Sequence, residues 1–512
     1  MGAAEAAAAT VEQRRPLTVG ISRPSWLSSP AAAAAEEIAD GEPLSPHSRI
    51  FRQPQLNCHV ISILGFGKII GKDEMKAGLE ATLVRHPRFS SIQARHAPVK
   101  TDNLGVKLVA LSQVTGKAGV RWVRTTVNLD EHVVYKDLGH GECTDGDRLV
   151  EDYASGLCRS PLDPSRPLWD VHILPIRSSE AASVAIFRFH HSLGDGVSLA
   201  SLLLDCTRRT SDPESLPSIP GAGRRPAGIG SRRFIFWLWA TTVYAWNTLV
   251  DIFLFFASAT VLKDTRTAIK GTEGIESRPK RFVHRALCLD DLKAIKSTIN
   301  DVLVGVLSAA LSRYLSRNSG GILPKNLRIK SIMFVNIRPS TGIHELAKMM
   351  KKGSGAEWGN RIGYILLPLP VMKCDDPLEY VRKGEAIAER KKNSWGAKFI
   401  YTSCSLIVKT LGLKAAILPF YKAVSNTTLA MSNLVGPTEE VGFCGSPLVY
   451  IATSVYGHPQ ALTVHFQSYM NKMEVVLAAD ELAIPNPHEL LDDIADSFEL
   501  IKDAAAAVPT SG

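Results

Sequence analysis

Residues 183–196 read SVAIFRFHHSLGDG, an apolar segment that ends in two histidines and a glycine-rich turn. The short apolar run Ser183–Phe189 predicts a buried strand. Adjacent residues of an extended segment point to opposite faces, so His190 and His191 cannot both face the same cavity. The two glycines of the turn let the backbone bend tightly and approach a ligand or a neighbouring segment. We therefore expect one histidine to face a site at the end of this strand.

The turn supplies four candidate catalytic residues, which are His190, His191, Asp195 and Gly196. A neutral imidazole, with an unperturbed pKa of about 6.5, can take a proton from a hydroxyl group at physiological pH. Asp195 follows the second histidine by four residues. Its carboxylate could orient a histidine or fix the loop by pairing with an arginine, and the sequence leaves both possibilities open. Without further context, two adjacent histidines are more often structural than catalytic.

Predicted strands and helices alternate on both sides of this motif. From 43 to 210, strands are expected at Cys58–Leu64, Trp169–Leu174 and Ser183–Phe189, and helices at Glu74–Val84 and Val197–Leu204. From 276 to 505, helices are expected at Asn300–Leu315 and Pro485–Lys502, and strands at Ile329–Val335, Ile362–Leu369, Leu448–Ser454, Ala461–Gln467 and Met473–Ala478. This mixture indicates an α/β (α+β) fold in two halves of similar size.

The remaining segments do not fit this pattern. Residues 1–42 contain two alanine tracts and few large apolar residues, so we expect a flexible low-complexity tail. Residues 506–512 are expected to form a second short tail. Between the halves, residues 211–275 combine a linker rich in serine, proline, glycine and arginine with a long apolar segment.

That apolar segment, Phe234–Leu262, has 29 residues, nine of them aromatic, and a single charge at Asp251. Arginines precede it and lysines follow it, and about 20 apolar residues can span a bilayer, so we predict membrane association. A buried helical hairpin of a soluble domain is the alternative. A single span would place the two halves on opposite sides of the membrane. Because Asn247 and Asp251 leave pieces of about 13–14 residues, we expect a re-entrant or interfacial anchor.

Composition limits the classes of function. A chain of 512 residues, 45% hydrophobic and 21% charged, can form a sizeable core and is neither disordered nor a coiled coil. Its net charge of +9 suits anionic partners such as membrane lipids, but no basic stripe predicts a nucleic-acid partner. The eight cysteines form no Cys-x-x-Cys pair and no zinc-ligand spacing, so we expect free thiols and no metal site.

The sequence His-His-x-x-x-Asp-Gly after an apolar strand resembles the motif of the CoA-dependent acyltransferase superfamily. Further segments resemble the plant wax ester synthase/diacylglycerol acyltransferase branch, and they extend from about residue 42 to 503. They include Pro167-Leu168-Trp169, Asn300-Asp301-Val302, Asn336-Ile337-Arg338-Pro339, Gly342–Ala347, Trp358–Tyr364, Met431–Pro437 and Ser454–Pro459. The Asp-Phe-Gly-Trp-Gly signature of the plant HxxxD branch is absent.

This resemblance implies two chloramphenicol-acetyltransferase-like halves around a shared tunnel. It implies acyl transfer from acyl-CoA to a fatty alcohol, giving a wax ester, or to diacylglycerol, giving triacylglycerol. His191 would be the general base and Asp195 a structural organiser, with no cofactor apart from the donor acyl-CoA. The expected location is the endoplasmic reticulum membrane, with the plasma membrane as a second location and both halves on the cytosolic side. A homodimer is a further possibility.

Four residues of the second half are candidates for substrate contacts. Ser432 and Asn433 could donate hydrogen bonds to the oxygen on which negative charge develops during thioester attack, or they could form a turn that only caps a strand. Asn336 and Arg338 could serve the tunnel or lock the interface. Two other functions stay open: a condensation-type transferase that uses a carrier-protein thioester, and a non-catalytic lipid-binding protein on the same fold.

Overall fold

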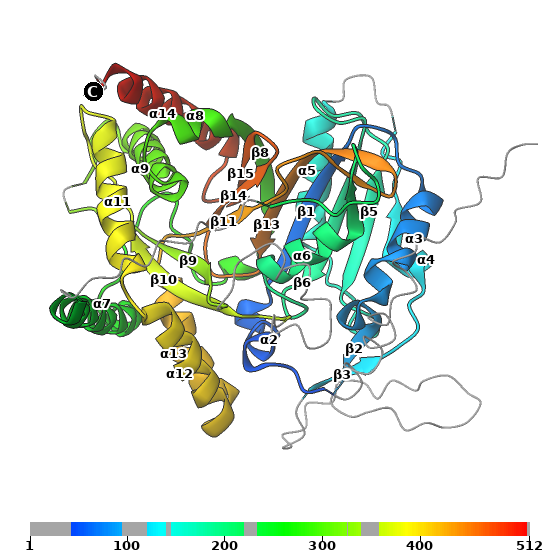
Figure 1. Cartoon of the computed structure of the whole chain (residues 1–512), viewed down its shortest axis with the longest axis horizontal. Helices are drawn as coiled ribbons and strands as arrows, with labels where there is room; N and C mark the ends of the chain where they lie inside the picture. The colour runs from blue at the N-terminus through cyan, green and yellow to red at the C-terminus, as the bar shows by residue number, and fades with distance from the viewer. Residues whose placement is uncertain are drawn as a thin grey trace, which may run out of the picture.

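The computed structural model describes residues 42–94, 120–139, 145–219, 233–324, 326–338 and 358–508 (Figure 1). Most of the tail predicted at 1–42 and part of the predicted linker lie outside these described residues. At the other end, helix α14 (Pro487–Ala507) continues two residues into the tail predicted at 506–512. Two large mixed sheets with helices packed against them make up the described chain, which confirms the predicted α/β (α+β) class.

The first sheet has seven strands in the order β4-β5-β6-β1-β13-β12-β7. Its strands are β1 (His59–Phe66), β4 (Val133–Tyr135), β5 (Trp169–Leu174), β6 (Ser183–His190), β7 (Thr207–Arg209), β12 (Val441–Phe443) and β13 (Ser446–Tyr456). The helices around it are α2 (Pro46–Ile50), α3 (Lys72–Ala81), α4 (Leu129–His132), α5 (Gly146–Leu157) and α6 (Gly196–Cys206), beside a small β2–β3 pair (Ser91–Ala94, Arg121–Arg124). Strands β1 and β6 are buried along their whole length, which explains their continuous apolar sequences.

The second sheet has six strands in the order β10-β9-β11-β14-β15-β8. They are β8 (Lys280–Cys288), β9 (Lys330–Asn336), β10 (Ile362–Pro368), β11 (Leu429–Val435), β14 (Leu462–Tyr469) and β15 (Lys472–Asp480). One face packs on α9 (Ile299–Asn318), α11 (Leu378–Lys392) and α14, with α8 (Leu289–Ala294) at its side. The other face packs on α12 (Gly396–Thr410) and α13 (Leu413–Ser425).

The two halves interlock through β12 and β13. The strand predicted at Leu448–Ser454 exists as β13, but it pairs antiparallel with β1 of the first sheet, from His59 opposite Tyr456 to Phe66 opposite Leu448. The chain therefore leaves the second sheet after β11, adds two strands to the first sheet and returns as β14. The segment at 211–275 divides the sequence into halves, but each half is not a separate folding unit.

The apolar segment forms one uninterrupted helix, α7 (Arg233–Thr260), at the outer edge of the second half (Figure 1). The buried helical hairpin and the re-entrant segment are therefore both wrong, whereas the interfacial anchor stays a prediction. Asn247 and Asp251 do not divide the helix, because they lie on the side that faces the protein. The Asn247 amide donates to the Asn393 carbonyl oxygen (2.9 Å), and Asp251 pairs with Lys391 (2.6 Å) and Arg390 (3.1 Å). Within the described residues, α7 alone is long and apolar enough to cross a bilayer, and 22% of its most apolar part is buried.

Candidate active site

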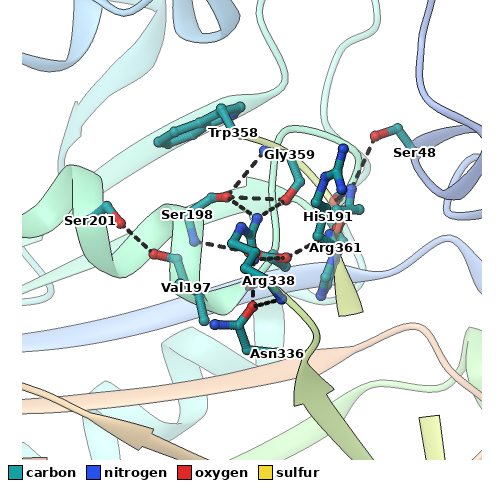
Figure 2. A network of polar contacts seen from close by, with 12 residues as sticks. Ser48, His191, Val197, Ser198, Ser201, Asn336, Arg338, Trp358, Gly359 and Arg361 are labelled. Atoms are coloured by element: carbon teal, nitrogen blue, oxygen red, sulfur yellow. Dashed lines mark hydrogen bonds and ion pairs between the residues drawn. The ribbon is translucent and has the colours of Figure 1, made fainter. Parts of the chain in front are cut away.

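His191 lies directly after β6, where the first half meets the second (Figure 2). Its backbone N–H donates to the Cys58 carbonyl oxygen (2.9 Å), and its ring stacks on the Phe51 ring with centroids 4.2 Å apart. The residue is only 8% exposed. This burial lowers the pKa of the imidazole below its ordinary value, although the nearby Asp195 carboxylate opposes the shift. The ring is therefore uncharged at physiological pH, which is the form that can accept a proton.

Asn360 of the second half determines which ring nitrogen accepts that proton. Its amide nitrogen is 2.9 Å from the His191 carbonyl oxygen and 3.1 Å from the Ser48 hydroxyl oxygen, so it donates to both. The amide oxygen therefore faces His191 Nδ1, at 3.1 Å, and accepts a hydrogen bond from the Nδ1–H group. This hydrogen-bond network assigns the hydrogen to Nδ1 and leaves the lone pair on Nε2. Our candidate list missed Asn360, although it lies in the resembling segment Trp358–Tyr364.

His190 points away from His191 into the first half. Its Nδ1 accepts from the Ser192 N–H (3.2 Å), and its Nε2 is 2.9 Å from the Asn57 side-chain oxygen. Both ring nitrogens are thus engaged, and burial holds the pKa of His190 well below its ordinary value. The arrangement matches the alternation expected along an extended strand. In this position His190 fixes the turn, and His191 alone faces the interface.

Asp195 and Arg338 form a buried ion pair across the interface, with 2.9 Å between Oδ2 and the guanidinium. The same carboxylate oxygen accepts from the Arg361 N–H (2.8 Å), while Oδ1 accepts from the Ser198 N–H (2.9 Å) and so caps α6. Arg338 also donates to the Gly359 carbonyl oxygen (2.7 Å). Of the two possibilities for Asp195, the structure supports the arginine pair that fixes the loop.

Arg338 and Asn336 likewise lock the interface. The side-chain oxygen of Asn336, at the end of β9, accepts from the backbone N–H of Arg338 (3.1 Å) and from its guanidinium (3.2 Å). Trp358 adds another contact between the halves, since its indole N–H donates to the Leu193 carbonyl oxygen (2.9 Å). These polar groups hold the motif loop against the second half.

Ser432 and Asn433 lie on opposite faces of β11. Asn433 donates to the Asn300 side-chain oxygen (2.7 Å) on the α9 side of the sheet. The two faces differ because side chains alternate along a strand, and both residues lie within β11 (Leu429–Val435) and not in a turn. Ser432 shares its face with Leu434 and is in register with His465 of β14. It therefore faces the first half, on the side where Leu434 lines the cavity described next.

Gly196 opens onto an apolar cavity between α6 and the first sheet. The cavity is small, with about 70 Å³ of space for the centre of a water-sized sphere. Its walls come from β1, β6, β13 and α6, and from Leu434 and Gln467 of the second half. A Cβ placed on Gly196 would meet no atom within 4 Å, so this glycine leaves the mouth clear. His191 does not line this cavity. The cavity begins at Gly196, which follows His191 by five residues in the motif loop.

No metal-binding arrangement is present in the part of the chain that the structure describes. That part contains no group of three or more His, Cys, Asp or Glu side chains placed to hold an ion. Its seven cysteines are all free thiols, and Cys143 lies outside the described residues.

The fold and the interface motif define a two-half acyltransferase. Residues 105–303 match the family model described as the wax ester synthase/diacylglycerol acyltransferase catalytic domain, and residues 358–502 match the WS/DGAT C-terminal domain. The chain belongs to the wax ester synthase/diacylglycerol acyltransferase family, as the resemblance predicted, and it is an acyltransferase.

Relatives match along almost the whole chain. Wax ester synthase/diacylglycerol acyltransferase 11 of Arabidopsis thaliana is 45% identical, with 92% of this chain and 96% of the relative covered. Number 6 of the same series is 43% identical, with 92% and 94% covered. Among solved structures, the wax ester synthase/diacylglycerol acyltransferase of Marinobacter aquaeolei VT8 has a TM-score of 0.55 at 19% identity, covering 91% of this chain and all of that one. The first condensation domain of the CDA synthetase has a TM-score of 0.52 at 13% identity, covering 92% of this chain and 97% of that one. This match shows a shared fold.

Proposed function

We propose that the protein transfers a fatty acyl group from acyl-CoA to the hydroxyl group of a long-chain alcohol or of diacylglycerol, with His191 as general base. One observation carries the proposal: Asn360 holds the uncharged His191 ring so that Nε2 is left to accept a proton. The names of the relatives, wax ester synthase/diacylglycerol acyltransferase, give the two acceptor classes.

The proposed reaction needs no covalent acyl-enzyme. Nε2 of His191 takes the proton of the acceptor hydroxyl as its oxygen attacks the thioester carbonyl carbon. The tetrahedral intermediate then expels the CoA sulfur, which receives the same proton from the imidazolium, so the base returns to its starting form. Such proton transfer typically contributes about 10²–10⁴ in rate. Because the pKa of His191 is lowered by burial, the base is ready at neutral pH.

The apolar cavity beside Gly196 suits a fatty acyl chain. Its lining includes Leu199, Ala200 and Leu203 of α6 together with Phe187 and Phe189 of β6. A hydrocarbon chain gains about 0.8 kcal/mol per buried CH₂ group in such surroundings. The open position at Gly196 would let the chain pass from the motif loop into the cavity.

The proposal also includes anchoring through α7 to the endoplasmic reticulum membrane, with the plasma membrane as a second location. Both halves would lie on the cytosolic side, because α7 packs along the second half instead of separating the halves. A helix that lies on the bilayer surface keeps the two halves together, whereas a single span would not. The apolar acceptors of the reaction would be supplied from the same membrane.

Purified protein or microsomes, supplied with labelled acyl-CoA and either a fatty alcohol or diacylglycerol, test the function. The wild-type chain should form ester, and His191→Ala should lose about 10²–10⁴ in rate. A matched control is His488→Ala, since this histidine is on the surface of α14. Equal ester formation by the wild type and His191→Ala would refute the general base. Product from a carrier-protein thioester alone would favour the condensation-type reaction, and binding without product would favour a lipid-binding protein.

A further inference from the structure

Helix α7 turns Asn247, Asp251 and Ser258 toward the protein and most of its large apolar residues outward. Five apolar side chains recur at helical spacing along its outer side and are each more than half exposed: Trp239, Trp246, Leu249, Phe253 and Phe256. On the inner side, Asn247 and Ser258 are buried and the Asp251 charge is paired. A helix at a water-exposed surface has the opposite arrangement. The outer side of α7 is therefore suited to apolar surroundings.

Helices α12 and α13 continue this surface. Trp395, at the start of α12, donates its backbone N–H to Thr248 (2.9 Å), and its ring is 5.4 Å from that of Tyr244 in α7. Phe255 of α7 contacts Phe420 of α13, with ring centroids 6.4 Å apart. The three helices lie together at one corner of the molecule (Figure 1). The two added helices expose further large apolar side chains, which are Trp395, Phe399, Leu406, Leu411 and Leu418.

The charges of this added part have one sign. From 393 to 425 the sequence contains no aspartate or glutamate and four lysines, Lys398, Lys409, Lys414 and Lys422, all of them exposed. On α13, Lys414, Leu418 and Lys422 are spaced four residues apart and so share one side of the helix. Alternating lysines and apolar side chains allow the hydrocarbon parts to enter a membrane while the ammonium groups contact headgroup phosphates.

We propose that α7, α12 and α13 together form one docking surface for a lipid leaflet that carries anionic headgroups. This proposal deepens the proposed function, since it rests on a membrane-borne acceptor and adds the α12–α13 pair and the lipid charge. The charge complementarity selects lipid as the occupant, because a second copy of the same lysine-bearing surface would repel the first.

The same helices lead to the active site. Phe255 of α7, Cys404 of α12 and Phe420 of α13 belong to a single apolar cluster that also contains Phe51. Phe51 stacks on the His191 ring. Beside it, His47 of α2 stacks on Tyr401 of α12 with centroids 4.1 Å apart. One apolar cluster thus connects this surface with the aromatic ring that stacks on His191.

Flotation of the full chain with vesicles tests the docking surface. Vesicles of phosphatidylcholine alone and of phosphatidylcholine mixed with phosphatidylserine would be compared, using the triple variant Phe399→Ser, Leu406→Ser, Leu418→Ser. The control replaces three apolar residues elsewhere that are even more exposed, Ile69→Ser, Ile322→Ser and Leu482→Ser. We expect the triple variant to bind phosphatidylserine vesicles about tenfold or more weakly than the control, which should match the wild type. Circular dichroism would establish that both variants are folded.

Further variants separate this inference from the α7 anchor. Trp246→Ser with Phe253→Ser should weaken binding to both vesicle types, and the substitution of the four lysines by glutamine should weaken binding only where phosphatidylserine is present. If the triple variant binds like the wild type while the α7 variant does not, the inference is overturned and the anchor stands. If neither the triple variant nor the α7 variant binds more weakly than the wild type, both the α12–α13 surface and the α7 anchor are refuted. Equal binding of the wild type to the two vesicle types overturns the anionic preference. A concentration-dependent dimer that the triple variant abolishes, with vesicle binding unchanged, would assign the surface to a second copy.

Discussion

The two sides of the motif loop differ sharply in chemistry. On the His191 side, polar groups from both halves fix a carboxylate, a guanidinium and an imidazole with hydrogen bonds of about 3 Å. On the Gly196 side, the surroundings are almost entirely apolar and leave a cavity. One loop of seven residues therefore separates rate from selectivity: the polar side should govern how fast the ester forms, and the apolar side which chain is used.

Breaking the ion pair on the polar side should have the largest effect. Replacing one partner, as in Arg338→Met, leaves the Asp195 carboxylate buried without its cation and should destabilise the fold by about 3–5 kcal/mol. Activity should fall with it, because the pair holds the motif loop against the second half. Chemical unfolding measures the loss. Arg285→Met, which removes an exposed ion pair with Asp492, is the control and should cost at most about 1 kcal/mol. A cost for Arg338→Met no greater than this would contradict the clamp.

Asn360 should affect rate more than stability. Asn360→Leu removes the group that fixes the His191 tautomer, and we expect kcat to fall about 10–100-fold, within the range of a general base. Asn360→Asp keeps an acceptor near Nδ1 and adds a negative charge, which favours the protonated ring. Its acid limb of kcat/KM against pH should therefore move to higher pH. An unmoved limb in the aspartate variant would indicate a purely structural role for this residue.

Filling the cavity should change selectivity more than overall rate. In Ala200→Phe, the ring would project from α6 into the space lined by Leu203 and Phe187. Loss of room costs about 1–3 kcal/mol per displaced methylene, so long acyl-CoA should lose about tenfold or more relative to short acyl-CoA. Competition between two labelled donors measures the ratio. Ala507→Phe, at the exposed end of α14, should leave it unchanged. An equal loss for both donors would place the acyl chain elsewhere.

The smallest effect concerns pH. Burial lowers the folded-state pKa of His191, so the ring stays uncharged as the pH drops through the ordinary histidine value of about 6.5. The acid limb of kcat/KM should thus fall below pH 6.5. The same sign applies to stability. Burial lowers the pKa values of His47 and His59 to about 4, so between about pH 6.5 and pH 4 these side chains bind protons mainly in the unfolded chain. Each contributes stability that is lost between about pH 6.5 and pH 4. An acid limb of kcat/KM at or above pH 6.5 would contradict the burial of the His191 ring.

The sequence was sufficient for the motif loop, the strands around it and the closing helix, because each has a strong local pattern. It left the Asp195 partner open, since an ion pair between positions 143 residues apart has no local signal. The expectation that Asn247 and Asp251 divide the apolar segment failed. The sequence alone does not distinguish a polar residue that faces the protein from one that interrupts a membrane-spanning helix. The turn alternative for Ser432 and Asn433 failed because β11 continues through both residues to Val435, just before Gly436 and Pro437. The apolar and basic surface of α12 and α13 was missed, since neither helix is long enough to attract notice alone.

The pairing of β1 with β13 has a consequence for synthesis of the chain. About 390 residues separate the paired strands, so at about 5–20 residues per second the ribosome needs roughly 20–80 s to deliver the partner of β1. Until then, the nascent first sheet exposes an unpaired strand edge of the kind that recruits other chains. Efficient production should therefore depend on chaperones that bind during translation, and the two halves expressed as separate polypeptides should fold only when they meet.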